Sequence, residues 1–156
     1  MTFTLSNKGI IKLDVSIIEI VQFYQQTEKE DLEAGGVLLG RFIVDSKNII
    51  VDKVSTPMPG DKRTRYSFNR GAKMHQRFID KEWNQSNGTS HYLGEWHTHP
   101  EKHPEPSGKD LSNWTIHLKR DTFSSRFLYF VILGTKEICI WEGDRRTFKF
   151  KKLKAL

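Results

Sequence analysis

Residues 97–110 read His-Thr-His-Pro-Glu-Lys-His-Pro-Glu-Pro-Ser-Gly-Lys-Asp. His97 and His99 stand one residue apart at the end of an expected strand over 91–97, so their side chains share one face. The prolines that follow stiffen the loop and offer no amide hydrogen to a sheet. The chain is therefore expected to turn here and to return with Asp110 at the start of a helix.

Two imidazoles and a carboxylate are the kind of ligands that zinc takes in catalytic sites, where the fourth position is left to water. A structural zinc site would need a fourth protein ligand. His103 is an alternative third ligand, because three histidines also form catalytic zinc sites. The other histidines are expected to be surface or packing residues: His75, His91 and His117. The sequence thus predicts one Zn²⁺ and a metal-assisted hydrolase.

Such a hydrolase also needs a proton acceptor that is not a ligand, since water must lose a proton and the leaving group must gain one. Four glutamates are candidates: Glu33, Glu95, Glu101 and Glu105. Glu95 precedes His97 by two residues on the same expected strand face, but this adjacency does not fix where it points. Ser107 and Asp110 have a second possible role, as the N-cap and the first-turn acid of a helix.

Hydrophobic periodicity predicts one α/β domain over residues 1–156. Helices are expected over about 14–26, on the apolar stripe Met74, Phe78, Ile79 and Trp83, and from Ser107 with Leu111, Trp114 and Leu118 buried. Strands are expected weakly over 3–12, in a hairpin of 37–44 and 49–54, around Tyr66 and Phe68, and over 91–97, 126–133, 136–141 and 147–151. Helices that alternate with strands indicate a sheet covered by helices.

The chain of 156 residues is 37% hydrophobic and 28% charged, a composition that excludes a disordered protein. Neither a signal peptide nor an apolar run long enough for a bilayer is apparent, so a cytoplasmic location is expected. A single cysteine, Cys139, excludes an internal disulfide and a cysteine-rich zinc site. Its apolar neighbours favour a buried thiol without a catalytic role.

The net charge of +6 is concentrated near the C-terminus. Residues 145–154 carry six cations and no acid, and the remaining cations balance the 19 acidic residues. This pattern predicts a solvated edge strand whose lysines discourage pairing with another sheet, with Phe148 and Phe150 on its buried face. The alternative is a surface for an acidic partner or for nucleic acid, and nucleic acid is the less favoured of the two.

The spacing of His97, His99, Ser107 and Asp110 resembles the signature of the JAMM (MPN+, JAB domain) metallopeptidases: histidine-any-histidine, seven residues, serine, two residues, aspartate. That family also has a glutamate before a glycine-rich strand, which residues 33–40 (Glu-Ala-Gly-Gly-Val-Leu-Leu-Gly) resemble. The resemblance extends over most of the chain. It implies a single α/β domain with a curved mixed β-sheet flanked by α-helices.

The same resemblance implies roles for individual residues. His97, His99 and Asp110 would bind one catalytic Zn²⁺, Glu33 would hold and deprotonate the water, and Ser107 would help to stabilise the oxyanion. Glu95 would then have a supporting role, and His103 would not be a ligand.

In that family the reaction is hydrolysis of an amide, often an isopeptide bond on lysine, and the substrate's extended C-terminal tail lies as an added strand. The chain looks most like small bacterial members encoded beside ubiquitin-transfer-like enzymes, the deconjugating isopeptidases of CBASS antiphage operons. The resemblance implies a protein conjugate as partner, such as a cyclic-nucleotide synthase attached through its C-terminus. The alternatives are a peptidase that trims a sulfur-carrier or ubiquitin-like protein, a catalytically silent MPN scaffold, and a nucleic-acid-binding protein.

Overall fold

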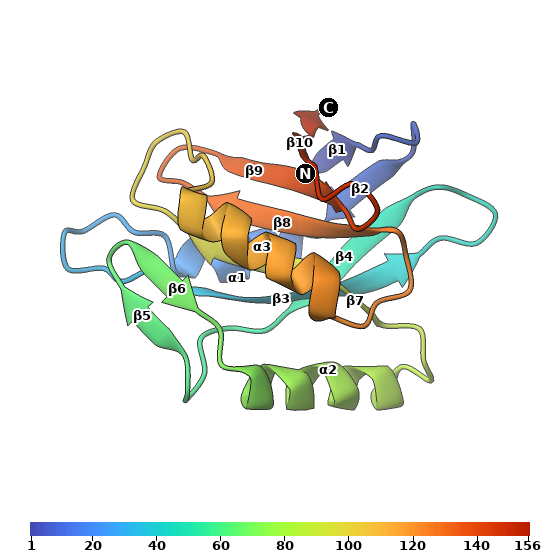
Figure 1. Ribbon diagram of the computed structural model, residues 1–156, viewed down its shortest axis with the longest axis horizontal. Coiled ribbons are helices and arrows are strands. Elements are labelled where there is room, and N and C mark those ends of the chain that lie inside the picture. The colour runs from blue at the N-terminus through green and yellow to red at the C-terminus, as the bar shows by residue number, and fades with distance from the viewer.

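The structure is a computed structural model that describes residues 1–156, and a nine-stranded mixed sheet organises it (Figure 1). The helices are α1 (Val15–Phe23), α2 (Ala72–Gln85) and α3 (Gly108–Arg120). The strands are β1 (Thr2–Thr4), β2 (Ile10–Leu13), β3 (Gly35–Phe42), β4 (Ile49–Val54), β5 (Lys62–Thr64), β6 (Ser67–Asn69), β7 (His91–Thr98), β8 (Phe127–Leu133), β9 (Ile138–Asp144), β10 (Phe150–Lys152) and β11 (Lys154–Ala155). None of the helices has the length and apolar character that a membrane crossing requires.

The large sheet is strongly curved. Its strand order is β10-β9-β8-β7-β3-β4-β2-β1-β11, with parallel pairing only between β2 and β4 and between β7 and β8. The edge strands β10 and β11 are separated in sequence by Leu153 alone, whose amide donates to the Ile140 carbonyl. Two strands that follow each other directly in the chain could not lie at opposite edges of a flat nine-stranded sheet. The sheet therefore curves until its two edges come close together. The predicted α/β fold with a curved mixed sheet is confirmed.

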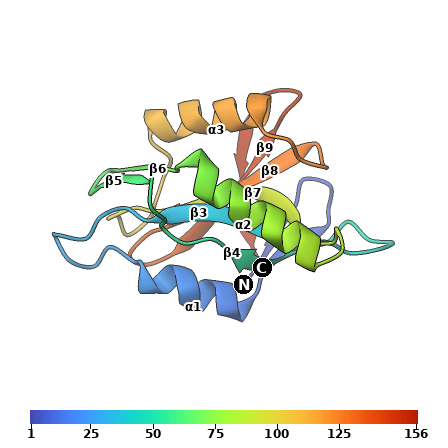
Figure 2. The same ribbon diagram turned by 90° about the horizontal axis from the view of Figure 1, so that it is seen from below.

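Helices cover both faces of this sheet (Figure 2). Ile17 and Val21 of α1 pack in the core cluster on one face, and Trp114 and Leu118 of α3 pack in the cluster on the other. Strand β8 contributes alternate residues to the two clusters, which explains its continuous apolar sequence. The prediction of a buried central strand here is confirmed, as is that of a buried Cys139.

The buried face of α2 was predicted only in part: Met74, Phe78 and Ile79 of the expected stripe are half-buried. Trp83 is 45% exposed, and the residues that α2 buries are His75 and Glu82. Each lies one position from the apolar stripe, because α2 contacts its neighbours through polar groups: Glu82 pairs with Lys53 of β4. The prediction for α3 holds at Trp114 and Leu118, whereas Leu111 is 37% exposed.

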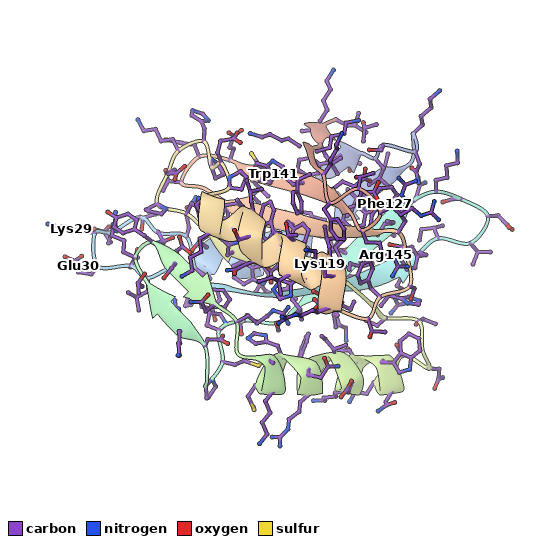
Figure 3. The ribbon with its side chains drawn as sticks, viewed as in Figure 1. Lys29, Glu30, Lys119, Phe127, Trp141 and Arg145 are labelled. Carbon is purple, nitrogen blue, oxygen red and sulfur yellow. The ribbon has the colours of Figure 1, made fainter.

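The basic C-terminal segment forms an edge of the sheet through β10, as predicted, but it is less regular than expected. Phe148 lies in a turn with φ 55° and is 39% exposed, so the prediction that it faces the core is wrong. Its ring instead lies 5.2 Å from the Lys119 ammonium of α3. Figure 3 labels Lys119, Trp141 and Arg145 on this side of the molecule, where the Arg145 guanidinium lies over the Phe123 ring.

Candidate active site

The two histidines of the motif converge at the end of β7. Their Nε2 atoms lie 3.0 Å apart, and both side chains are buried. Thr98 between them points the opposite way, where its hydroxyl accepts from the Ala34 amide. The Thr98 amide donates in turn to the Ala34 carbonyl. This pairing joins the end of β7 to the residue just before β3, so the two sequence motifs lie side by side.

Asp110 reaches the histidines from the first turn of α3. Its Oδ1 lies 3.4 Å from His97 Nε2, and its Oδ2 lies 3.1 Å from His99 Nε2. The helix begins with a capping box, in which Ser107 Oγ accepts from the Asp110 amide and Asp110 Oδ2 accepts from the Ser107 amide. Ser107 is therefore the N-cap, and the box fixes the direction in which the Asp110 carboxylate points.

Glu33 lies beside the histidine pair. Its Oε1 is 3.8 Å from His99 Nε2, and the residue is buried. The backbone of Glu33 is held by β5: its amide donates to the Thr64 carbonyl at 2.8 Å, and its carbonyl accepts from Arg63 Nε at 2.7 Å. The β5–β6 hairpin, of which only part was predicted, thus positions this glutamate.

Burial and neighbouring charges shift the pKa values of the two carboxyl groups of the site in opposite directions. Burial raises the pKa of Glu33 to about 7, although the neighbouring His97 and His99 oppose the shift. Burial would also raise the pKa of Asp110, but hydrogen bonds with the two histidines outweigh it, so this pKa is lowered. For His97, burial alone would lower the pKa, and Asp110 reverses the direction. One carboxyl can therefore exchange a proton near neutral pH while the other stays ionised.

The donor atoms of this cluster could hold a metal ion. One ligand atom from each of Glu33, His97 and His99 lies within 4.8 Å of the others. Asp110 also contacts both histidine Nε2 atoms. Three nitrogen or oxygen donors that converge in a buried site match the protein contribution to a catalytic metal centre. The structure therefore brings together all three residues predicted as ligands and the predicted glutamate.

The other candidates from the sequence lie outside the cluster. Glu101 Oε1 is 3.5 Å from Nδ1 of His99, the nitrogen that faces away from the cluster. Glu105 pairs with Lys152, and His103 is exposed and pairs with Glu137. His103 thus does not contribute to the cluster, as the family resemblance implied.

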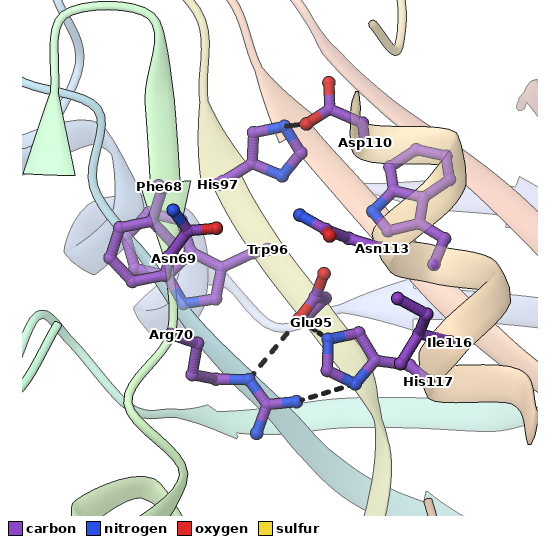
Figure 4. Close-up of a pocket in the computed structure, with 11 residues that line it drawn as sticks. Phe68, Asn69, Arg70, Glu95, Trp96, His97, Asp110, Asn113, Ile116 and His117 are labelled. Carbon is purple, nitrogen blue, oxygen red and sulfur yellow. Dashed lines mark hydrogen bonds and ion pairs between the residues drawn. The ribbon is translucent and has the colours of Figure 1, made fainter. Parts of the chain in front are cut away.

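Glu95 lies beside the cluster and closes one end of a groove (Figure 4). The groove has a volume of about 190 Å³ and runs between β6 and α3 over the surface of β7, with His97 and Asp110 at its other end. Glu95 Oε2 lies 3.4 Å from Arg70 Nε and 3.3 Å from His117 Nε2. These three charged or polar side chains form a network at the far end of the groove.

Four residues of the groove were not predicted from the sequence: Asn69, Arg70, Asn113 and His117. His117 was expected to be a surface or packing residue, but it lines the groove together with Asn113. The missed signal is helical spacing: positions 110, 113 and 117 of α3 lie on one face, so the residues after the predicted ligand Asp110 had to face the same side. No comparable pattern predicts Asn69 and Arg70, because they lie where the short strand β6 ends and the chain leads into α2.

A family model described as prokaryotic homologs of the JAB domain matches residues 19–149. A CD-NTase/cGAS isopeptidase of Pseudomonas aeruginosa is 39% identical over 69% of this chain and 67% of its own length. One of Vibrio cholerae is 33% identical over 85% of this chain and 81% of its own length.

A solved structure of a Desulfitobacterium hafniense protein shares the fold, with a TM-score of 0.64 at 18% identity, over 91% of this chain and 88% of that one. The family match and the relatives identify the protein as a hydrolase. The chain belongs to the prokaryotic JAB-domain family.

Proposed function

We propose that this protein is a zinc-dependent, deubiquitinase-like isopeptidase, with His97, His99 and Asp110 as the zinc ligands. The observation that carries the proposal is the convergence of these three side chains beside the buried Glu33. The separations between the donor atoms, 3.0 to 3.4 Å, are close to the roughly 3.3 Å that two ligands about 2.0–2.1 Å from a tetrahedral ion would have. A bound Zn²⁺ would supply a Lewis acid that polarises the substrate carbonyl and lowers the pKa of water.

The protein's own side chains would then move the proton. The buried Glu33 would accept a proton from the attacking water and release it to the leaving amine. Asp110 would remain ionised throughout, because a carboxylate binds a metal ion in its deprotonated form. Ser107 would stabilise the oxyanion: its oxygen accepts from the Asp110 amide, which leaves the hydroxyl hydrogen free to donate.

The proposed substrate is a conjugate in which the C-terminal tail of one protein is joined to a target, as the relatives named CD-NTase/cGAS isopeptidase suggest. Strand β6 pairs only with β5, so its second edge is free for an added strand. The modified protein would be a cyclic-nucleotide synthase linked by a ubiquitin-transfer-like enzyme, in antiphage defence in the bacterial cytoplasm. A tail-trimming peptidase would use the same side chains on a linear substrate.

Substitution of Glu33 tests the chemistry. We expect Glu33→Gln to retain zinc and to lower the cleavage rate by about 10²–10⁴-fold, the usual contribution of a general base. The substrate is a CD-NTase joined through its C-terminus to a lysine side chain, with a linear fusion of the same tail for comparison. Glu30→Gln is the matched control, since Glu30 is exposed at the tip of the loop before Glu33 (Figure 3).

Full activity of Glu33→Gln would contradict the proposed proton transfer. Loss of zinc from this variant would show instead that Glu33 is a ligand. Cleavage of the linear fusion but not of the branched conjugate would favour the tail-trimming peptidase.

A further inference from the structure

We propose that Asn69 and Asn113 form a carboxamide clamp that hydrogen-bonds the backbone of the substrate tail next to the bond to be cleaved. This inference rests on the proposed function, since it concerns the substrate of the same site. Asn69 is the last residue of β6, and Asn113 lies one helical turn after Asp110 on α3. In Figure 4 their side chains face each other across the groove, between His97 and Glu95.

The two carboxamides are free hydrogen-bonding groups in the groove. Both side chains are half-buried, and neither forms a hydrogen bond within the protein. Their polar atoms are not among the buried unpartnered ones, so they remain accessible and available to a ligand. By contrast, the charged side chains at the far end of the groove are engaged: Arg70 and His117 both contact Glu95, and His117 also contacts Asp121.

The groove continues directly to the proposed metal ligands. His97 and Asp110 line the same cavity as the two asparagines, so a chain that lies between Asn69 and Asn113 reaches them without a barrier. Buried Trp96 and Trp114 also line it and supply an apolar surface beside the polar pair. This position places the clamp on one side of the reacting amide.

Peptide backbone is the ligand chemistry that fits. A carboxamide offers two donors and one acceptor, which match the carbonyl and the amide hydrogen of a peptide group. The cavity of about 190 Å³ is smaller than the roughly 300–1,000 Å³ of typical small-molecule sites, which suits a short extended segment. Recognition of backbone by two opposed carboxamides would position the tail with little dependence on its side chains.

The test uses the zinc-loaded full chain and a branched peptide in which the tail of a CD-NTase is joined through its terminal carboxylate to a lysine side chain. A second peptide carries an N-methyl group on the backbone amide that precedes the cleaved bond. Asn113→Ala and Asn69→Ala are compared with Asn84→Ala, an exposed asparagine of α2. Bound zinc and thermal unfolding are measured for each variant, and kcat and KM are determined on both peptides.

We expect each clamp variant to raise KM about 5- to 10-fold with normal zinc, the effect of losing one hydrogen bond, while Asn84→Ala changes neither constant. N-methylation should weaken cleavage by the wild type by a similar factor, and it should have less effect on the variant that has lost the partner of that amide. If one variant folded poorly, the other would still test the clamp, because its coupling to N-methylation is measured independently.

Clamp variants that cleave both peptides like the wild type would overturn the clamp alone. The clamp would also be overturned if N-methylation weakened cleavage by the same factor in both variants as in the wild type, because the asparagines and the amide would then act independently. If the wild type did not cleave the unmodified branched peptide, the proposed function would fail, and the clamp with it.

Discussion

Two buried histidine clusters of this protein differ in how completely their hydrogen bonds are satisfied. In one, His97 and His99 face each other and Asp110. In the other, His75 of α2 lies between Ser55, just after β4, and Asp61 in the following loop. Both clusters contain residue types used in catalysis, so residue type alone does not separate an active site from a structural one.

Every polar atom of the Ser55–His75–Asp61 cluster has a partner. Ser55 Oγ accepts from the Val37 amide and lies 2.7 Å from His75 Nδ1, and Asp61 Oδ1 and Oδ2 lie 3.0 Å from His75 Nε2. Asp61 also accepts from the Gly71 amide. The arrangement reverses a hydrolytic triad, in which Nε2 faces the serine. With the Ser55 residue 1%, the His75 residue 0% and the Asp61 side chain 1% exposed, no substrate can reach it.

The His97–His99–Asp110 cluster is incomplete by the same standard. Two imidazole Nε2 atoms 3.0 Å apart compete for one carboxylate, and the groove opens beside them. A cation could bind both imidazole nitrogens and the carboxylate together. In the Ser55–His75–Asp61 cluster, by contrast, no side-chain atom is left without a hydrogen-bond partner to bind a cation. Unused bonding capacity next to a groove therefore distinguishes the candidate site from the structural cluster.

The largest expected effect comes from changing the aspartate of each cluster to asparagine. Asp110→Asn should lower both bound zinc and cleavage by more than about 100-fold, which exceeds the 10–100-fold effect of a residue that only supports a ligand. Asp61→Asn should retain zinc and lose about 1–3 kcal/mol of unfolding free energy, because its amide group cannot accept all the hydrogen bonds of the carboxylate. Metal analysis and urea unfolding of both variants measure the contrast.

The opposite pattern would exchange the roles of the two clusters. If Asp61→Asn lost zinc at unchanged stability, the metal would lie at the Ser55–His75–Asp61 cluster. Asp110→Asn with normal zinc would remove Asp110 from the ligand set.

A smaller effect is expected in the pH dependence of the metal-free protein. The pKa of Glu33 is about 7 in the folded chain, against its usual 4.5. Between these values the unfolded chain has lost the proton that the folded chain keeps, so stability falls as the pH rises. Relative to Glu33→Gln, the chelated wild type should lose on the order of 3 kcal/mol between pH 4.5 and 7. Denaturant titrations of both proteins across this range measure it, and parallel curves would contradict the raised pKa.

The sequence predicted one half of the candidate site from local geometry. Alternation on β7 placed His97 and His99 on one face, and the serine and aspartate pattern placed the start of α3. Glu33 could not be found in this way, because its position depends on hydrogen bonds with Arg63 and Thr64 in a distant hairpin. Only the family resemblance selected it among the four glutamates.

The parts of the fold that were missed share a physical cause. Periodicity detects apolar faces, and α2 buries His75 and Glu82 through hydrogen bonds and an ion pair. Phe148 likewise has a positive φ, and a positive φ cannot be predicted from an aromatic residue because such residues rarely adopt it. Polar burial and unusual backbone geometry become visible only when the partners are known.

The smallest expected effect concerns two exposed glutamates that each contact a histidine. Glu101 lies 3.5 Å from Nδ1 of His99, and Glu137 lies 2.9 Å from Nδ1 of His103. A carboxylate hydrogen-bonded to the outer nitrogen orients a metal-binding imidazole, but Nδ1 of His99 has no hydrogen-bond partner and the Glu101 side chain is 52% exposed. Glu101→Gln should therefore weaken zinc binding less than about tenfold. Glu137→Gln should leave zinc affinity unchanged, because His103 lies outside the cluster. Competition for zinc with a chelator measures both, and equal effects of the two substitutions would show that Glu101 acts only through general surface charge.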